Sequence, residues 1–563
     1  MHEEFTHILR TAYFSMEIAL SSDIPTYSGG LGVLAGDTMR SAADLELPMV
    51  AVTLVSRAGY FRQEIDAAGR QIEHPVPWEP SQRCVPLAAK IAVSIEGRDV
   101  WVGAWLYVLK GHMGGRQPII LLDTDLNENE PGDRTITHYL YGGDNEYRIK
   151  QEIVLGIGGV RMLHALGFRI SEYHLNEGHS ALLTLELLRR FGYAPEEVRA
   201  GESPYDIHKV RSLCNFTTHT PVEAGHDKFP YELVQRILGN YIELPTLKTL
   251  AGPDHLNMTR LALNLSEYVN GVAKSHAETS GRMFPGYYVR AITNGVHPFT
   301  WTSPGFAALY DLHIPGWSHE PEFLTRADLM TDEEIWAAHT QAKQTLLHEV
   351  QKRCGIRLDP DQPIIGFARR MTAYKRPDLL FSDLGRLREI ARRWPLQIVL
   401  SGKAHPRDEG GKRLIEQLHG YMRELANEIP MAFVPNYDME LGLTLVSGVD
   451  VWLNTPLRPL EASGTSGMKA ALNGVPSLSV LDGWWVEAWL EGVNGWAIGN
   501  LAESADNTDA EALYRKLDET VLPLYHNDRA GWIRVMKGAI TKSASMFNSH
   551  RMMRRYAAEA YLR

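Results

Sequence analysis

The chain contains 563 residues, of which 44% are hydrophobic and 22% are charged, and these near-average values exclude a disordered chain, a collagen and a coiled coil. Lysine and arginine total 57 against 68 acidic residues, which gives a formal net charge of −11 and disfavours a role centred on nucleic acid or an anionic membrane surface. An anionic substrate would therefore need a local cluster of basic residues.

The cysteines and the first residues of the chain indicate the cellular compartment in which the protein is expected. Cys84, Cys214 and Cys354 lie far apart and form neither a disulfide framework nor a CxxC metal motif, so a reducing cytoplasm is expected. The first ten residues carry acids and lack an apolar run, which predicts no signal peptide. Apolar runs stay far below the roughly 20 residues of a membrane-spanning helix, so no membrane association is expected.

The first half of the chain mixes predicted strands and helices. Apolar runs predict strands at 11–15, 49–55 and 118–123 and a helix at 146–166 that ends near Gly167. Segments 90–95 and 100–109 predict an antiparallel hairpin with a four-residue loop, Glu96 to Asp99. Residues 310–323 contain prolines and a glycine and lack periodicity, which predicts a linker.

The second half has a regular rhythm. Thr331 and Glu334 form a capping-box pattern that predicts a helix at 335–353. Predicted strands follow at 364–368, 396–401, 431–435, 449–453 and 477–481, alternating with predicted helices at 377–393, 411–426, 439–447 and 467–473. This alternation predicts a parallel, doubly wound sheet. We therefore expect an α/β fold with two Rossmann-like lobes, residues 1–320 and 321–539, facing an interdomain cleft where ligands bind.

The segment EASGTSGMK at 461–469 carries the sharpest chemical signal. Small residues lead from a predicted strand into a short helix, where free backbone amides attract an anion. Lys469 lies in the first turn beside apolar residues, and both desolvation and the helix field favour its neutral, nucleophilic amine. A phosphate cradle with such a lysine suits pyridoxal phosphate. The alternative is a Gly/Ser-rich loop with an exposed lysine, and no Walker A motif is present.

A basic cluster follows the predicted strand at 364–368. Residues 369–376 (RRMTAYKR) contain four cations and no acid. Because the carboxyl end of a strand lies at the expected cleft, the cluster predicts an anion site in this acidic chain. The alternative is a solvated basic loop.

Two further motifs are less specific. The glycine-rich run from Tyr27 to Gly36 matches a dinucleotide pattern loosely, but the next predicted strand ends in Ser56-Arg57, with no acid to hold a ribose. A nicotinamide site is therefore disfavoured, while approach of backbone amides to an oxyanion remains open. The HLNEGH segment at 174–179 lacks the HExxH spacing, so no metal site is predicted.

Segments 217–220 (TTHT) and 293–295 (TNG) each end a predicted strand with hydrogen-bonding side chains. Together with Glu461 they are candidates for recognising sugar hydroxyls. The 13 tryptophans and 23 tyrosines suit stacking on sugars, although such residues more often fill cores.

Several long motifs occur in one order along most of the chain: YSGGLGVLAGD, HLNEGHSALL, TTHTPVEAGHDKF, ITNGVHPFTW, RRMTAYKRPDLL, GKAHPRDEGGK and EASGTSGMKAALNG. In these motifs the chain resembles the glycogen/α-glucan (maltodextrin, starch) phosphorylase family, in a compact bacterial or archaeal branch. The resemblance implies a glycosyltransferase of carbohydrate metabolism (EC 2.4.1.1) that converts α-1,4-glucan or maltodextrin and inorganic phosphate reversibly to α-D-glucose 1-phosphate. It also implies pyridoxal 5'-phosphate, the two-lobed GT-B architecture, a C-terminal helix at 540–563 crossing back to the first lobe, and a homodimer.

The resemblance assigns roles to individual residues. Four are implied to be catalytic: Lys469, Arg370, Lys375 and His219. The implied cofactor residues are Lys469, which carries it, Gly464, Thr465 and Ser466, which cradle its phosphate, and Arg369, Tyr437 and Trp301, which lie against it. Arg370 and Lys375 would bind the substrate phosphate with the amides near Gly29 and Gly30. The implied glucan residues are His219, Asn294, Glu461, Ser463 and Gly464, with Glu177 and Glu17 nearby.

In this family the substrate phosphate protonates the glycosidic oxygen and then captures the glucosyl cation on the same face, so the anomeric configuration is retained. This sequence departs from the family at two places. It reads GTSGMK where many members read GTGNMK, and it has Ala19 where many have a tyrosine. Regulatory and glycogen-storage elements of the larger members are expected to be absent.

Two competing interpretations differ in what they require. A retaining nucleotide-sugar glucosyltransferase of the glycogen or starch synthase type shares the two lobes and an Arg/Lys pair, but it has no need of a Schiff-base lysine such as Lys469. A catalytically inactive glucan-binding protein is disfavoured because Lys469, Arg370 and Lys375 are all present.

Overall fold

The computed structural model describes residues 2–199, 201–501 and 505–562, and it contains two large sheets. The first sheet has the strand order β14-β13-β10-β9-β1-β2-β8-β7-β5, with β6 also paired to β7. It is parallel from β14 to β8 and antiparallel from there on. Its strands are β1 (Leu9–Phe14), β2 (Met49–Leu54), β5 (Val85–Pro86), β6 (Ile91–Ile95), β7 (Arg98–Lys110), β8 (Arg116–Asp123), β9 (Arg169–Asn176), β10 (Cys214–Thr217), β13 (Tyr268–Gly271) and β14 (Arg290–Ala291).

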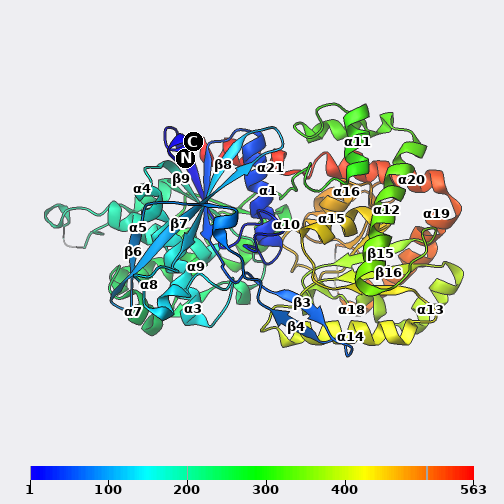
Figure 1. The fold of residues 1–563 in the computed structure, drawn as a ribbon, viewed down its shortest axis with the longest axis horizontal. Helices are drawn as coiled ribbons and strands as arrows, with labels where there is room; N and C mark the ends of the chain where they lie inside the picture. Colours follow the sequence, from blue (N-terminus) through cyan, green and yellow to red (C-terminus); the bar gives the residue numbers. More distant parts are fainter. Residues whose placement is uncertain (1, 200, 502–504, 563) are drawn as a thin grey trace.

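The second sheet has six strands, all parallel, in the order β17-β16-β15-β18-β19-β20. Its strands are β15 (Ile364–Ala368), β16 (Gln397–Ser401), β17 (Met431–Val434), β18 (Val451–Asn454), β19 (Ser477–Val480) and β20 (Gly495–Ile498). We call the residues around each sheet the first lobe and the second lobe, and the two lie side by side in Figure 1. The α/β fold class is confirmed, and one largely parallel sheet beside one wholly parallel sheet is consistent with the expected GT-B architecture.

Helices cover both sheets. In the first lobe these are α1 (Gly30–Asp44), α2 (Pro131–Arg134), α3 (Asn145–Ile153), α4 (Gly159–Ala165), α5 (Leu183–Arg190), α6 (Ile207–Ser212), α7 (Tyr231–Leu238), α8 (Leu244–Ala251), α9 (Met258–Asn264) and α10 (Lys274–Met283). The later helices are α11 (Pro304–His313), α12 (Asp332–Cys354), α13 (Leu384–Arg393), α14 (Glu409–Leu425), α15 (Met439–Gly448), α16 (Ser466–Ala471), α17 (Trp485–Ala488), α18 (Asp506–Lys516), α19 (Leu522–Asn527), α20 (Arg529–Gly538) and α21 (Ser549–Tyr556). Among the described residues, no helix has the length and apolar character needed to cross a membrane.

Two predicted boundaries were wrong for identifiable reasons, and one predicted helix has the expected ends but contains a π-helical turn. The hairpin turn has two residues rather than four, because Glu96 and Gly97 both take positive φ, as a type I′ turn requires. The helix predicted from 377 begins at Leu384, where the Asp383 side chain accepts the Arg386 backbone N–H. A π-helical turn, Val154–Gly158, interrupts the helix predicted at 146–166.

The predicted linker at 310–323 is packed rather than free. Its first residues complete α11, and a 3₁₀ helix, Pro321–Leu329, follows. Tyr310 and Trp317 are fully buried, and the Tyr310 hydroxyl donates to the Leu472 carbonyl. Apolar burial therefore outweighs the turn-forming residues, and the division at residue 320 stays a prediction.

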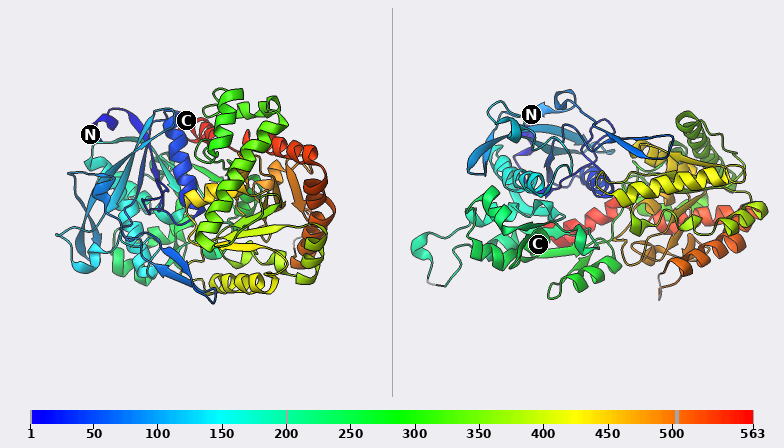
Figure 2. Two further views of the ribbon diagram at one scale, coloured as in Figure 1. Left: turned by 45° about the vertical axis from the view of Figure 1, so that its right-hand side comes forward. Right: turned by 90° about the horizontal axis from the view of Figure 1, so that it is seen from below.

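The C-terminal segment joins the two lobes. Figure 2 shows the last residues running from the second lobe to the first. There α21 packs on α1, and Met552, Met553 and Tyr556 fill the same core cluster as Met39 on α1. Gly295 permits this crossing, because a Cβ there would lie 2.1 Å from the Asn548 carbonyl oxygen.

A second connection is the hairpin of β3 (Arg62–Ile65) and β4 (Gln71–His74), which extends from the first lobe toward α14 (Figure 1). Gln63 exchanges hydrogen bonds with Asn436 and donates to the Gly402 carbonyl at 2.9 Å. Gln71 exchanges hydrogen bonds of 3.0 Å with the Ala404 backbone. No local pattern predicts this arm, since its bonds go to groups more than 300 residues away in the chain.

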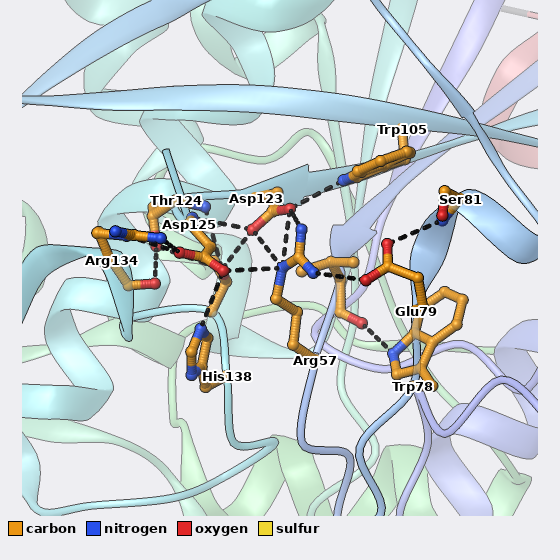
Figure 3. A network of polar contacts seen from close by, with 12 residues as sticks. Arg57, Trp78, Glu79, Ser81, Trp105, Asp123, Thr124, Asp125, Arg134 and His138 are labelled. Atoms are coloured by element: carbon orange, nitrogen blue, oxygen red, sulfur yellow. Dashed lines mark hydrogen bonds and ion pairs between the residues drawn. The ribbon is translucent and has the colours of Figure 1, made fainter. Parts of the chain in front are cut away.

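A polar network fixes the loop that leaves β8. Arg57, just after β2, donates to Asp123 at 2.7 Å, and Trp105 Nε1 donates to the same carboxylate at 2.8 Å (Figure 3). Asp125 on this loop pairs with Arg134, while Asp123 Oδ1 accepts the Asp125 backbone N–H. The loop leads to Tyr141, whose hydroxyl reaches the candidate site described below.

Candidate active site

Lys469 is a buried lysine in the first turn of α16, and it faces an aromatic ring. Its Nζ lies 3.7 Å from the centroid of the Trp301 ring, and both side chains are at least 95% buried. Burial lowers the pKa of Lys469 to about 8, and Arg369 adds to this while Asp37 acts against it. The amine is therefore neutral in a sizeable fraction of molecules near pH 7–8, as the sequence argument expected.

Trp301 links three elements around Lys469. Its Nε1 donates to Asp37 Oδ2 on α1 at 2.8 Å, and its carbonyl accepts the Asn473 side-chain N–H. Tyr437 approaches from the second lobe. A Cβ on Gly442 would lie 2.7 Å from the Tyr437 hydroxyl and 3.6 Å from the Trp301 ring, so a larger residue would crowd this wall. The sequence expected Trp301 and Tyr437 beside one cofactor, and the structure places them together.

Glu461 gathers two of the expected cations. Lys375 Nζ lies 2.8 Å from both Glu461 oxygens, and Arg369 pairs with the same carboxylate and with Asn454. Burial alone would raise the pKa of Glu461, but the lowering caused by Arg369 and Lys375 is larger, and the resulting pKa is about 2. Glu461 is thus a charged anchor of the basic cluster in this structure. Lys375 would have to share its charge with any bound phosphate.

Arg370 has no such carboxylate partner within the part of the chain that the structure describes. Its guanidinium faces the glycine-rich loop, since a Cβ on Gly29 would lie 3.3 Å from Arg370 Nη2. A Cβ on Gly30 would meet nothing within 4 Å, so open space lies beside the loop. The basic cluster therefore contains three cations that are paired with carboxylates, Arg369, Lys375 and Arg376, and one that is available to an external anion, Arg370.

Glu17 organises the glycine-rich loop. Its Oε2 accepts the backbone N–H groups of Ser28 at 2.6 Å and Gly29 at 3.2 Å, and its Oε1 accepts the Tyr141 hydroxyl at 3.0 Å. The Gly29 amide expected to bind phosphate is consequently engaged by Glu17. Gly32 is required for this approach, because a Cβ there would lie 2.6 Å from Glu17 Oε2.

Glu177 holds the loop that carries His219. It has φ of 70°, a left-handed conformation that is rare for a non-glycine residue. Its Oε2 accepts the His219 backbone N–H and the Thr220 hydroxyl, both at 2.8 Å. Burial alone would raise the pKa of Glu177, but the nearby histidines, His226 and His219 among them, together lower it more. The net pKa is below the ordinary value, so the side chain is a carboxylate at neutral pH.

His219 is a neutral imidazole with a defined tautomer. Its Nε2 lies 2.7 Å from Asn176 Oδ1, and Asn176 donates its amide to Ser15, so the His219 proton lies on Nε2. Burial lowers the pKa of His219 to about 4, although Glu177 acts against it. The side chain can offer Nδ1 as an acceptor, and it does not carry a charge at pH 7.

Two expected sugar-binding residues have buried polar atoms without a protein partner. Asn294 Oδ1 and Ser463 Oγ make no hydrogen bond in the structure. Ser463 precedes Gly464, whose φ of 70° lets the chain turn into α16. Ser466 accepts the Trp452 indole N–H, so its hydroxyl is partly engaged. Buried unpaired groups of this kind commonly mark a ligand position.

The histidines of HLNEGH do not share a centre. His174 uses both ring nitrogens, one toward the Tyr561 hydroxyl at 2.6 Å and one toward Thr217 at 2.9 Å. Elsewhere, Asp44, His297 and His550 lie close together and buried. The Thr300 backbone N–H donates to His297 Nδ1, so His297 Nε2 carries the proton that Asp44 accepts at 2.8 Å.

Three residues at the site were missed from the sequence: Asp37, Tyr141 and Asn176. Asp37 lies within the YSGGLGVLAGD motif, and an acid on a glycine-rich helix could have been noticed. Asn176 lies within the HLNEGH motif, but its role and that of Tyr141 depend on contacts with His219 and Glu17 that are distant in sequence.

Comparison with known proteins places this geometry in a family. The sequence profile described as "Carbohydrate phosphorylase" matches residues 246–494. The maltodextrin phosphorylase of Thermococcus litoralis is 42% identical over 594 aligned residues, which cover 98% of this chain and 70% of that protein. The chain belongs to the carbohydrate phosphorylase family.

Other members of the carbohydrate phosphorylase family match over the same extent. The glycogen phosphorylase of Mycobacterium bovis is 36% identical over 98% of this chain and 70% of its own length. That of Aquifex aeolicus is 34% identical over 99% and 87%. The predicted family is confirmed, and these relatives give no support to the alternative of a nucleotide-sugar glucosyltransferase.

Proposed function

We propose that this carbohydrate phosphorylase is an α-1,4-glucan phosphorylase (EC 2.4.1.1) that uses pyridoxal phosphate. Its reaction is the reversible phosphorolysis of α-glucan or maltodextrin with inorganic phosphate to α-D-glucose 1-phosphate, with retention of configuration. The observation that carries the proposal is the buried Lys469 amine held over Trp301 at the start of α16. The relatives named above are maltodextrin and glycogen phosphorylases, which favours the same substrate class.

The residues present fit the cofactor. Lys469 supplies a buried amine of lowered pKa, Trp301 and Tyr437 supply apolar walls, and Ser463 Oγ is a buried hydroxyl without a partner. Gly464, Thr465 and Ser466 would hold the cofactor phosphate where α16 begins, with Arg369 beside them. The chemistry that pyridoxal phosphate supplies when bound is a phosphate group that exchanges a proton with the substrate phosphate.

The protein's own residues bind and orient the reactants. Arg370, which has no carboxylate partner among the described residues, would bind the substrate phosphate beside Gly30, and Lys375 would contribute by sharing its charge between Glu461 and the anion. These cations offset repulsion between closely placed anions and stabilise charge that develops on the phosphate in the transition state.

The glucosyl unit would lie between the two lobes. Asn294 Oδ1 and Ser463 Oγ are buried and unpartnered, and His219 Nδ1 is left as an acceptor, so each could pair with a sugar hydroxyl. Glu177 keeps His219 in place, and Glu17 keeps the glycine-rich loop in place. The lobe boundary at residue 320, the homodimer and a cytoplasmic location stay predictions.

The proposed function is tested by Lys469→Ala. Borohydride reduction of the cofactor-loaded protein should leave a pyridoxyl group on the peptide that contains Lys469, and the variant should lose both this label and phosphorolysis. Lys403→Ala is the matched control, because the Lys403 amine is also largely buried with a pKa lowered to about 8 but donates to the Phe61 carbonyl instead. Full phosphorolysis by Lys469→Ala without added cofactor would contradict the proposal.

A further inference from the structure

Asp37 is a buried carboxylate, and one of its oxygens lacks a hydrogen-bond donor among the described residues. The side chain lies in the second turn of α1 and is 1% exposed. Oδ2 accepts the Trp301 indole N–H at 2.8 Å, whereas Oδ1 is buried and has no hydrogen-bond partner in the described part of the chain. A buried carboxylate oxygen without a donor is costly, so its presence calls for an additional partner.

The neighbouring cation does not supply that partner. Arg40 Nη1 lies 3.8 Å from Asp37 Oδ1, which exceeds hydrogen-bond distance, and Nη1 is itself buried and unpartnered. Arg40 Nη2 donates to the Leu20 carbonyl at 2.8 Å, which holds the guanidinium in this position. The hydrogen-bonding capacity of Oδ1 therefore remains free on the protein side.

Asp37 and Lys469 are fixed by the same indole. The Trp301 indole N–H donates to Asp37. The face of the same ring lies against the Lys469 amine, with its centroid 3.7 Å from Nζ. The carboxylate and the amine therefore lie against the same indole. A planar group attached to Lys469 and packed along Trp301 would bring its far edge toward Asp37.

We propose that Asp37 Oδ1 accepts a hydrogen bond from the protonated ring nitrogen of the cofactor that Lys469 binds. This inference rests on the proposed function. Of the polar groups of pyridoxal phosphate, the phosphate and the phenolic oxygen are acceptors that a carboxylate repels, while the ring nitrogen becomes a charged N–H donor opposite an acid. Asp37 is accordingly a cofactor-positioning residue that also anchors Trp301.

The decisive measurement uses the holoenzyme loaded with pyridoxal phosphate carrying ¹⁵N in the ring. The ¹⁵N chemical shift distinguishes a protonated from a neutral ring nitrogen. We expect the protonated form in the wild type at pH 7 and the neutral form in Asp37→Asn, whose amide can still accept the Trp301 N–H but carries no charge. Cofactor affinity in Asp37→Asn should fall about 10- to 100-fold, as for loss of a hydrogen bond to a charged group.

Trp301→Phe is the matched control, because it removes the indole N–H and leaves the Asp37 carboxylate in place. The ring nitrogen of the cofactor bound to Trp301→Phe should remain protonated. If Asp37 only anchored Trp301, the two variants would weaken the cofactor alike and leave the nitrogen signal unchanged, which would overturn the inference. A neutral ring nitrogen in the wild type would overturn it without any variant, even if Asp37→Asn fails to fold.

The failure of the proposed function would look different. In that case borohydride would leave no pyridoxyl group on Lys469 in either the wild type or Asp37→Asn. A label on Lys469 in both proteins together with a neutral nitrogen in the wild type would refute only the role of Asp37.

Discussion

Arg370 differs from the other cations of its cluster because it has no carboxylate partner among the described residues, while Lys375 and Arg369 share Glu461. Arg370→Ala should therefore change the kinetic parameters for phosphate more than those for glucan. We expect a raised KM for phosphate and a barrier to turnover higher by about 2–4 kcal/mol, the usual cost of losing a charge-stabilising donor.

The control for this change is Arg413→Ala, an exposed arginine on α14. Steady-state phosphorolysis at varied phosphate and fixed maltodextrin separates the two, with Arg413→Ala close to wild type. Unchanged phosphate kinetics in Arg370→Ala would remove Arg370 from the proposed phosphate site.

Glu461 makes a pH-dependent contribution to stability. Its folded pKa of about 2 lies below the ordinary value of 4.5, so the contribution is full above about pH 4.5 and is lost as the pH falls toward 2. At pH 7, Glu461→Gln should lower the free energy of unfolding by about 2–4 kcal/mol, because Lys375 and Arg369 lose a buried partner. Urea unfolding should show a smaller difference from wild type at pH 4 than at pH 7. A difference that is constant across this range would show that the charge of Glu461 is not what stabilises the site.

At the scale of single elements, the second sheet was the most predictable part of the chain. The strand at Ile364–Ala368 was predicted residue for residue, and the Thr331–Glu334 capping box starts α12 as expected. Parallel strands buried on both faces leave continuous apolar runs, which a local pattern can reveal. β20 and the arm of β3 and β4 were not predicted, because their pairing depends on partners elsewhere in the fold.

The candidate site was predictable only where a motif carries the chemistry. The GTSGMK motif pointed to Lys469, and the RRMTAYKR motif pointed to Arg370. The pairing of Lys375 with Glu461 spans 86 residues, and the use of the Gly29 amide by Glu17 depends on the fold of the loop. Such contacts follow from tertiary packing, so the sequence named the participants without showing which were already engaged.

The helix α21 is tied to the first sheet by buried hydroxyls. Tyr556 accepts the Asn270 amide at 2.9 Å and lies 3.2 Å from the Thr217 hydroxyl. Tyr556→Phe should lower the free energy of unfolding by about 1–3 kcal/mol, because one N–H of the buried Asn270 amide loses its acceptor while the Gly271 carbonyl remains as the other acceptor. Chemical denaturation is the measurement, and Tyr288→Phe, at a side chain that is 75% exposed, should cause no change. Equal stability of the two variants would show that this anchor is not needed.

For the whole molecule, α21 and the arm of β3 and β4 are two of the connections that join the lobes, and Glu487 adds further bonds to Lys274 and Thr293. Because each connection bonds to the opposite lobe at several points, we expect the lobes to unfold together in one calorimetric transition. The double variant Gln63→Ala with Gln71→Ala removes the glutamine side-chain bonds of the arm and should separate the transition into two. A single transition in the double variant would mean that the remaining contacts between the lobes are enough to couple them.

The position of α21 also has a consequence for biosynthesis. Ser41 on α1 bonds Ser549, a residue 508 positions later in the chain, and Met552 and Tyr556 complete the apolar cluster around α1. At about 5–20 residues per second, a ribosome needs on the order of 25–100 s to make that stretch. Throughout this interval the apolar cluster around α1 stays partly exposed in the nascent chain. Chaperones can therefore bind this surface until translation is nearly finished.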